Sequence, residues 1–439
     1  ALPILTKHVL SAFGLHVIQE EVEMGMAAAA RAFGIRVEKF YIFFDAFNVK
    51  LISFTRGGTE YGIGWLPLGG YVKIAGMIDE SMDKEQMKRP AQPDEFRSKP
   101  AWQRFIVMVA GIVMNIIFGV VFMSVYLGGF QQTYTPVEAV NQDGIYATEF
   151  GRDLGFQDGD ELVAVNGRSH RRLSDFESLR VALGAEVTVR RDGEEVVIPV
   201  PSLFPRIQSG QPTAIFDVRA QVVIDSVLPN SFAAEGGLRS GDTIRAVETT
   251  DVKTFSQFKE VTRSKANGTV SVLVDRGAQD ELMRVRVDSA GRMGFIATIH
   301  DPYAGEPYTL GRSLRYGLKD AVNDLVVNVM GFGKIFQGEV SARDSVASPI
   351  GIAKMFGATW DWARFWRLTA LISIILAFMN ILPIPALDGG HMMFLTIEMI
   401  TGRPVSDRVM EVAQVIGIIL LLSLMVFAFG NDILKSFGI

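Results

Sequence analysis

The sequence lacks cysteine altogether and contains only five histidines among its 439 residues. Without cysteine the chain has no disulfides, no thiolate metal ligands and no cysteine nucleophile. An excess of one charge is lacking too, because 43 basic and 48 acidic residues leave a net charge of −5. A charge so close to neutral gives no basis for nucleic-acid binding, so we expect no nucleic-acid partner. The first apolar stretch has no basic leader and no clear small-residue cleavage site, so we expect no cleavable signal peptide.

Apolar residues, by contrast, are abundant and gathered in blocks. They make up 49% of the chain, and residues 105–127 contain no charged side chain. About 20 apolar residues are enough to cross a bilayer. Similar blocks cover residues 368–387 and 412–429, and a more polar one lies within residues 1–34. The pattern predicts a polytopic α-helical membrane protein with four transmembrane segments in a lipid bilayer.

A stretch of different character follows the first of these blocks. Residues 35–54 are rich in β-branched and aromatic side chains, which favour strands over a membrane helix. Glycines then recur up to the pair Gly69 and Gly70. We therefore predict a membrane-associated β-hairpin within residues 35–75, centred on residues 61–74. An open hairpin edge can pair with an extended peptide, although an ordinary β-ribbon at the membrane surface would have the same sequence pattern.

The middle of the chain contains an internal repeat. Residues 155–165 recur 82 positions later as residues 237–247, and in both copies a Gly-Asp turn leads into an alternating strand. A short helical stretch and further strands follow each copy. The repeat predicts two α+β domains, residues 128–205 and residues 206–300, that resemble PDZ domains. Such domains take an extended peptide or a chain terminus onto a sheet edge; the alternative is a pair of spacer domains that shape access without binding.

Basic residues indicate the topology. Arg97, Lys99 and Arg104 precede the second predicted membrane segment, and Arg403 and Arg408 precede the fourth. An excess of basic residues marks cytoplasmic ends, so the PDZ-like pair is expected on the extracytoplasmic side. The rest of the chain then forms two membrane halves, residues 1–127 and residues 301–439.

The third apolar block ends in an unusual polar motif. Residues 380–391 read Asn-Ile-Leu-Pro-Ile-Pro-Ala-Leu-Asp-Gly-Gly-His. Polar groups such as Asn380 and Asp388 are costly at membrane depth and by default mark a working site. Pro383 and Pro385 break helical hydrogen bonding, which is tolerated only where protein or a cavity satisfies the backbone. The alternative is a helix that ends at the interface with the carboxylate in water.

Taken together, these features resemble the site-2 protease family, of the bacterial regulator of sigma-E protease type with two PDZ domains. The most specific match is Asn-x-x-Pro-x-Pro-x-Leu-Asp-Gly-Gly at residues 380–390. The resemblance implies an intramembrane zinc endopeptidase of the bacterial inner membrane. It also implies regulated intramembrane proteolysis, in which a membrane-spanning substrate such as an anti-sigma factor is cut within its membrane segment.

The same resemblance implies roles for individual residues. Asp388 would be the third zinc ligand, and Asn380 would hold the substrate strand or stabilise the oxyanion. Pro383 and Pro385 would keep the helix open beside the site. The hairpin, including Gly69 and Gly70, would hold the substrate in an extended form.

The chain departs from the family at the zinc site. The family pattern His-Glu-x-x-His falls on residues 22–26, which read Val-Glu-Met-Gly-Met. Glu23 keeps the position of the general base, but Val22 cannot ligate a metal and the thioether of Met26 suits soft ions rather than zinc. Catalytic zinc sites use three protein ligands. A shifted site made of His16, Glu20 and Asp388 remains an alternative.

Two functions therefore stay open from the sequence. The first is an intramembrane zinc protease whose catalysis is impaired or absent as the chain is written. The second is a non-catalytic membrane protein that binds peptides through its PDZ-like domains. A transporter is disfavoured because the membrane segments show no inverted repeat. Asn115, in the middle of the second segment, either joins two helices through a hydrogen bond or faces the same site as Asn380.

Overall fold

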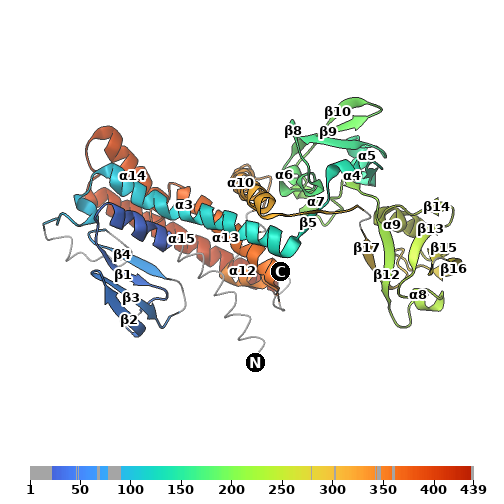
Figure 1. Ribbon diagram of the computed structural model, residues 1–439, viewed down its shortest axis with the longest axis horizontal. Coiled ribbons are helices and arrows are strands. Elements are labelled where there is room, and N and C mark those ends of the chain that lie inside the picture. Colours follow the sequence, from blue (N-terminus) through green and yellow to red (C-terminus); the bar gives the residue numbers. More distant parts are fainter. Residues whose placement is uncertain are drawn as a thin grey trace. The chain divides into compact units, whose positions relative to one another are not determined.

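The computed structural model describes residues 22–45, 47, 49–66, 70–77, 90–277, 279–300, 303–341, 343, 348–357 and 361–436. The chain forms two compact units (Figure 1). The first unit, here called the helical unit, combines Ala1–Gln132 with Tyr308–Ile439, and the second, the repeat unit, is Thr133–Pro307. Most of the first predicted membrane segment lies outside the described residues, and only its end, a helix of residues 22–32, is described.

Three helices of the described part are long and apolar enough to cross a membrane: Ala101–Gln131, Trp362–Ile381 and Arg408–Leu434. They contain most of the second, third and fourth predicted segments. The third helix ends six residues earlier than predicted, at Ile381, because the chain leaves the helix ahead of Pro383. The bounds of the helices in this unit are α3 Ala101–Val125 with its π-helical continuation η3 Tyr126–Gln131, α10 Leu310–Phe336, α12 Pro349–Met355, α13 Trp362–Ile381, α14 Asp388–Thr401 and α15 Asp407–Ser436.

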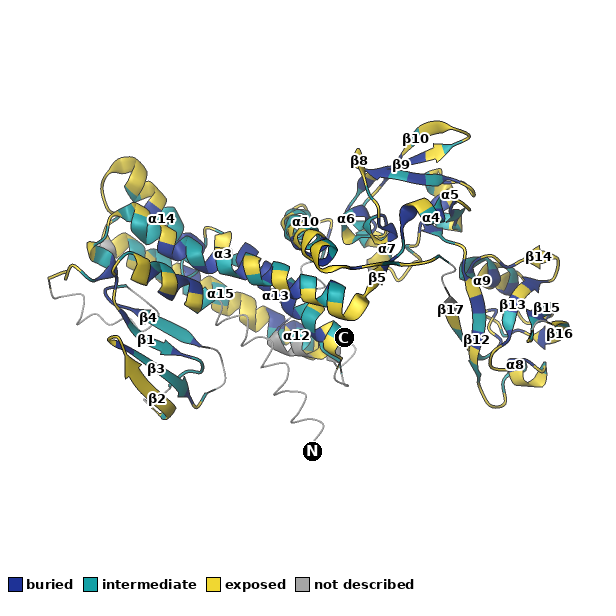
Figure 2. Cartoon of the chain, in the orientation of Figure 1, coloured by how far each residue is buried: buried dark blue, intermediate teal, exposed yellow. Residues whose placement is uncertain are grey.

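Close packing in the helical unit centres on α3. Helices α10, α13 and α14 all pack against it, and small residues bring them near. A Cβ atom on Gly119 would lie 2.7 Å from the side chain of Ile374 in α13, and one on Gly317 of α10 would overlap Ser124. Small residues at such contacts let membrane helices approach closely. Helix α15 is exposed along most of its length (Figure 2), which leaves an apolar surface of the kind that faces lipid.

A four-stranded sheet precedes α3, in the order β2-β3-β1-β4. Its strands are β1 Val37–Tyr41, β2 Lys50–Arg56, β3 Thr59–Gly64 and β4 Tyr71–Ile74. Strands β2 and β3 form a hairpin, but the predicted hairpin that joins residues 61–64 to residues 71–74 is wrong, because β1 lies between β3 and β4 (Figure 1). Several of the glycines serve close approach: a Cβ on Gly64 would overlap the carbonyl of Phe44, and one on Gly70 would lie 2.6 Å from Tyr41 O.

The outer strand β2 is apolar and exposed. Leu51 and Ile52 are each 63% exposed and Phe54 is 59% exposed, and Figure 2 shows the strand in the colour of exposed residues. An exposed apolar edge strand invites contact with another surface. This pattern is compatible with the membrane association expected for residues 35–75. Gly69 lies outside the described residues, so its place in the sheet is not described.

The repeat unit contains a common order of elements twice, and the first repeat adds the short helices α4 Val137–Val140, η4 Leu173–Asp175 and α7 Phe204–Gln208 (Figure 1). The first repeat has a sheet of order β10-β9-β7-β8, and the second has β16-β15-β13-β12-β17. Each repeat encloses its own apolar core. The elements of the first repeat are β6 Tyr146–Ala147, α5 Glu149–Leu154, β7 Glu161–Val165, β8 Arg168–Ser169, α6 Leu179–Ala182, β9 Ala185–Arg191, β10 Glu194–Val200 and β11 Phe216–Asp217. Those of the second are β12 Gln221–Val227, α8 Phe232–Glu235, β13 Thr243–Val247, β14 Thr250–Asp251, α9 Phe255–Ser264, β15 Thr269–Asp275, β16 Asp280–Arg286 and β17 Phe295–His300.

The repeated Gly-Asp turn has a structural role. Asp160 is 1% exposed, accepts a hydrogen bond of 2.9 Å from the amide of Gln157 and is bonded to Arg191 Nε at 2.7 Å. In the second repeat Asp242 is equally buried, and its partners are the amide of Arg239 at 2.9 Å and Arg276 Nε at 2.7 Å. Each aspartate thus ties its turn to a neighbouring strand end, which explains why the sequence repeats at these positions.

Replacing Asp242 with asparagine is expected to destabilise the second repeat by about 3 kcal/mol, because removing one member of a buried ion pair leaves the other without its partner. Faster hydrogen–deuterium exchange of the β15 amides in the full chain would report the loss. Asp251→Asn, an exposed position in the same repeat, is the matched control and should leave exchange unchanged. Equal exchange in both variants would contradict the stabilising role.

The same ion pair predicts a pH dependence. Burial opposes ionisation of Asp242, but the hydrogen bonds from Arg276 and from the Arg239 amide outweigh burial and hold its pKa below the ordinary value. The folded pKa therefore lies below the unfolded value of about 3.9. The stabilisation is complete above that unfolded value and is lost as the pH falls through the folded pKa. The loss of stability on acidification below about pH 4, measured as the increase in opening of the β15 amides relative to neutral pH, should consequently be smaller in Asp242→Asn than in the unmutated chain, because the variant has already lost this stabilisation at neutral pH.

Candidate functional site

The polar motif of the third membrane helix forms a break between two helices. Helix α13 ends at Ile381, residues 382–387 are not helical, and α14 begins at Asp388. Within the break Ala386 has a φ of 81°, a left-handed conformation that is uncommon for a residue with a side chain. The predicted effect of Pro383 and Pro385 on the helix is therefore seen directly in the backbone.

Asn380 and Asp388 meet across this break. The Asn380 side-chain amide donates a hydrogen bond of 3.2 Å to a carboxylate oxygen of Asp388. Because Asp388 is the first residue of α14, its negative charge also lies at a helix N-terminus, where the helix dipole favours it. The two residues that the sequence singles out thus form one polar pair, held at the point where the helix is interrupted.

Three glycines allow the break to pack tightly. A Cβ atom on Gly389 would overlap the carbonyl of Leu382, and one on Gly390 would lie 2.6 Å from Ile384 O. A Cβ on Gly417, in the middle of α15, would overlap the carbonyl of Pro385. Sequence reasoning missed Gly417, and its one signal is an isolated glycine within an otherwise apolar helix.

The helix of residues 22–32 packs against α3. A Cβ on Gly111 would lie 2.8 Å from the Val22 side chain and 3.3 Å from that of Met26. These two residues, which the resemblance assigns to the positions of the family's zinc histidines, therefore point together at α3. Gly25 lies against Ala110 and Met114 of the same helix.

Helix α14 also packs against α3. Arg104 pairs with Glu398, and Leu395, one turn earlier in α14, belongs to the same apolar cluster as residues of α3 one turn after Arg104. The two helices therefore run antiparallel. Asp388 precedes Glu398 by ten residues and Met114 follows Arg104 by ten, so for antiparallel helices of equal rise we expect Asp388 near the level of Met114, which Gly25 contacts.

Glu23, on the same helix as Val22 and Met26, contacts the sheet. Its carboxylate accepts a hydrogen bond of 2.8 Å from the backbone N–H of Val72 in β4. Strand β4 is an edge of the sheet, so Glu23 satisfies one of the backbone groups that an edge strand leaves open. Glu23, which the resemblance assigns to the family's general-base position, thus connects the helix of residues 22–32 to the sheet, close after Gly70.

The described residues do not fit a zinc ion. No group of three or more histidine, cysteine, aspartate or glutamate side chains that could hold a metal is found in the described part of the chain. Val22 and Met26 instead belong to an apolar cluster that also contains Met392 and Leu395 of α14. The alternative ligands His16 and Glu20 lie outside the described residues.

Asn115 joins α3 to α13, though not through its side chain. Its backbone carbonyl accepts a hydrogen bond of 2.8 Å from the Ser373 hydroxyl. Its side chain is fully buried, and both polar atoms of the amide have no hydrogen-bond partner among the residues that the structure describes. The side-chain hydrogen bond between two helices, one of the two alternatives for Asn115, is therefore not made among the described residues, and the main chain makes an interhelical bond instead.

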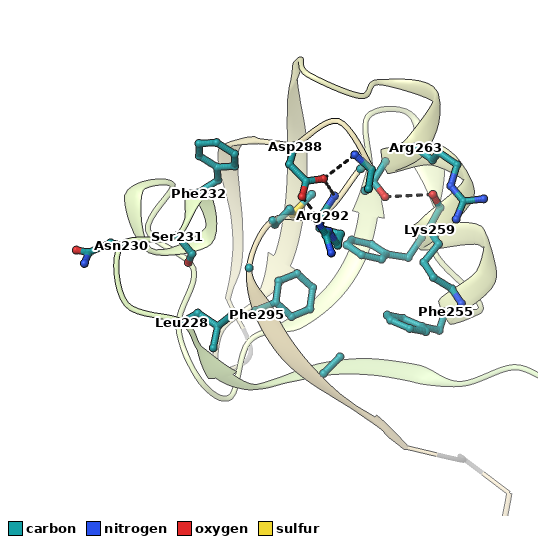
Figure 3. A pocket seen from close by; sticks show the side chains of 17 residues that line it. Leu228, Asn230, Ser231, Phe232, Phe255, Lys259, Arg263, Asp288, Arg292 and Phe295 are labelled. Carbon is teal, nitrogen blue, oxygen red and sulfur yellow. Dashed lines mark hydrogen bonds and ion pairs between the residues drawn. The ribbon is translucent and has the colours of Figure 1, made fainter. Parts of the chain in front are cut away.

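A second candidate site is a pocket of about 660 Å³ in the second repeat. It lies between α9, the edge strand β17 and the loop of residues 287–294, and Figure 3 shows its lining. The corresponding elements of the first repeat are much shorter. Helix α6 has four residues where α9 has ten, and β11 has two where β17 has six. The two repeats, although similar in sequence, therefore differ in the length of the helix and the strand that line this pocket in the second repeat.

Comparison with known proteins identifies the family. The profile of "Peptidase family M50" matches residues 13–424. "Regulator of sigma E protease" from Haemophilus influenzae is 29% identical over 94% of this chain and 95% of its own length. "Regulator of sigma-E protease RseP" from Escherichia coli is 29% identical over 93% of this chain and 94% of its own. A relative from Vibrio cholerae, 29% identical over 93% of this chain and 94% of its own, is named a zinc metalloprotease. The resemblance to site-2 proteases is thereby confirmed, and the chain belongs to peptidase family M50.

Proposed function

We propose that this chain captures a membrane-spanning protein and holds its membrane segment without zinc-dependent cleavage. One observation carries the proposal: Val22 and Met26 occupy the family's zinc-ligand positions and pack into an apolar cluster against Gly111. Neither side chain is a zinc ligand, and a single carboxylate, Asp388, is short of the three protein ligands of a catalytic zinc site. The peptide-holding parts of the family pattern are nevertheless present.

Three features support the holding of a peptide. The break after Ile381 keeps Asn380 and Asp388 paired beside an interrupted helix. Strand β4 is a sheet edge next to Gly70. The second repeat, which we interpret as a PDZ-like domain, has a pocket beside the edge strand β17. An edge strand with an adjacent pocket is the usual arrangement for adding an extended peptide to a sheet.

The proposed setting follows from the family and the charge pattern. The chain would lie in a bacterial inner membrane as a multi-pass protein, with both PDZ-like domains on the extracytoplasmic side. Its partner would be a membrane-spanning protein, such as an anti-sigma factor, whose extracytoplasmic part has been trimmed to leave a free chain end. The first, shorter PDZ-like repeat would act as a spacer.

A second candidate function is zinc-dependent endopeptidase activity through other ligands. It is favoured by the retention of Asp388, Asn380 and Glu23 together. Its zinc would be held by Asp388 with ligands from the chain before Val22, of which His16 and Glu20 have suitable chemistry and helical spacing. Such an enzyme would hydrolyse peptides with the help of zinc, in line with the name zinc metalloprotease that the Vibrio cholerae relative carries.

The decisive experiment measures zinc and partner retention on the same purified full chain. Elemental mass spectrometry is expected to find substoichiometric zinc. A single-span membrane protein with a free carboxyl end outside the membrane is expected to co-purify with the chain in detergent and to stay intact. One zinc per chain with chelator-sensitive cleavage would replace this proposal by the second candidate. A partner that is neither retained nor cleaved would contradict both.

A further inference from the structure

Asn115 has a buried side chain that the packing of the helices leaves unused. The side chain is fully buried in α3, within the uncharged block of residues 105–127. Neither the amide nitrogen nor the amide oxygen has a hydrogen-bond partner among the described residues. A buried polar atom without a partner costs the free energy of removing it from water, and few such atoms are found in native structures. The ligand-free chain is therefore destabilised at Asn115, where an apolar side chain would carry no such cost.

Asn115 lies between the candidate site and α13. Gly111 is one helical turn earlier on the same face of α3, and it packs against the side chains at the two positions that the resemblance assigns to zinc histidines. On another side, the Ser373 hydroxyl of α13 donates a hydrogen bond of 2.8 Å to the Asn115 carbonyl. Helices α3 and α13 also meet at Gly119 and Ile374 (Figure 1). The unpartnered amide is thus one helical turn from the centre of the candidate site.

Helix α13 links this position to the break. Ser373 precedes Asn380 by seven residues, which is two turns of helix, so both residues lie on one side of α13. The distance along the helix axis is about 10 Å, and about three residues of an extended strand cover the same distance. An extended segment that runs beside α13 would therefore meet Asn115 and Asn380 with residues about three apart.

The chemistry of the amide points to a main-chain ligand. An asparagine side chain offers N–H donors and a carbonyl acceptor. A cation would satisfy only the oxygen and an anion only the nitrogen, whereas a peptide main chain supplies a carbonyl and an N–H together. In an intact membrane helix these main-chain groups are bonded within the helix, so only an unwound segment offers them to Asn115.

We propose that the Asn115 side chain hydrogen-bonds to the main chain of a captured membrane segment that is unwound over about four residues beside α13. Because Asn115 is buried, the segment reaches the amide only after the surrounding helices move apart, and the new hydrogen bonds offset the cost of this movement. The proposal rests on the proposed capture of a membrane-spanning partner and adds the residue that recognises the partner's main chain.

Two variants test the cost at Asn115 in the ligand-free chain. Asn115→Leu removes both polar atoms, and Asn115→Thr places a hydroxyl that can bond to the Gly111 carbonyl four residues earlier. Both variants are expected to raise the thermal midpoint of the full chain in detergent by about 2 °C. Ser373→Ala, which removes the hydroxyl bonded to the Asn115 carbonyl, is the matched control and is expected to lower it. A lower midpoint in both Asn115 variants would mean that the closed chain uses the amide for its own stability, and would overturn the proposal.

Amide-to-ester substitution in a peptide tests the contact itself. The probes are a labelled single-span peptide with a Gly-Pro pair in the middle of its apolar segment, and analogues in which one amide bond near that pair is an ester, which lacks the N–H donor. Binding to the full chain in detergent is measured by fluorescence anisotropy. At one position the ester is expected to weaken binding to the unmutated chain about fivefold. The same ester is expected to leave binding to Asn115→Leu unchanged, since two groups in contact do not contribute independently.

The same titrations distinguish this contact from capture in general. Esters that weaken binding equally to the unmutated chain and to Asn115→Leu, or that weaken neither, would overturn the role of Asn115 and leave the capture of a membrane segment intact. No binding of the parent peptide to the unmutated chain would contradict the proposed capture itself.

Discussion

The double variant Val22→His with Met26→His is expected to bind one zinc ion per chain, where the unmutated chain binds a substoichiometric amount. Histidines four residues apart on a helix share one face, and Val22 and Met26 both point at Gly111 of α3. The antiparallel packing of α14 on α3, anchored by the Arg104–Glu398 pair, is expected to bring Asp388 to the same level. Two imidazoles and one carboxylate complete the three-ligand set typical of catalytic zinc sites.

Zinc content after dialysis, measured by elemental mass spectrometry, checks this result. Ala28→His with Ala32→His is the matched control, because it adds the same residues at the same spacing on an exposed face of the helix and should gain little zinc. Adding Asp388→Ala to the first pair should remove most of the bound metal. A folded Val22→His, Met26→His protein without zinc would mean that Asp388 does not share a site with these two positions.

Replacing Gly417 with alanine is expected to distort the backbone of residues 382–387, the break after α13, and to destabilise the protein. The added Cβ would overlap the carbonyl of Pro385, and backbone cannot move aside as the end of a flexible side chain can. Overpacking of a well-packed site costs about 1–3 kcal/mol and sometimes more. We expect a cost of at least about 3 kcal/mol and displacement of residues 382–387, which carry the chain from Asn380 to Asp388.

Two measurements report on this variant. The thermal midpoint in detergent is expected to fall by about 5 °C or more. Because the chain has no cysteine, a single Ala386→Cys reporter shows whether the break becomes more open to a maleimide reagent. Gly430→Ala is the control on the same helix, since no described heavy atom lies within 4 Å of its Cβ, and it should be neutral or slightly stabilising. If the two alanine variants behave alike, the tight contact with Pro385 is not important for the site.

Much of the helical unit was predictable because a membrane helix is recognised from one continuous apolar segment of the sequence. An uncharged block such as residues 105–127 has few alternatives to a spanning helix, and the structure extends it only to Ala101–Gln131. Asn380, Pro383 and Asp388 were found for the same reason, since polar residues and prolines stand out against an apolar block. Gly417 did not stand out, because its partner Pro385 is distant in sequence and the contact exists only once α15 packs against the break.

The strand order of the sheet and the lengths of the elements in the two repeats could not be predicted from local sequence patterns. Glycines near Gly64 and Gly70 were read as hairpin signals, but strand order depends on which segments pair, and β1 inserts between β3 and β4. The internal repeat correctly indicated a recurring order of elements. It did not reveal that α9, which lines the pocket of the second repeat, is longer than α6.

The sequence by itself determined the family of this protein, three of its long apolar helices and its internal repeat, because each is a property of residue type and spacing. The tertiary structure decided which of those residues meet. It paired Asn380 with Asp388, turned Glu23 towards Val72 and packed Val22 and Met26 against Gly111. It also placed Lys259 and Arg263 in the lining of a pocket beside the edge strand β17. These contacts join segments far apart in the chain, and their geometry depends on packing that no local pattern encodes.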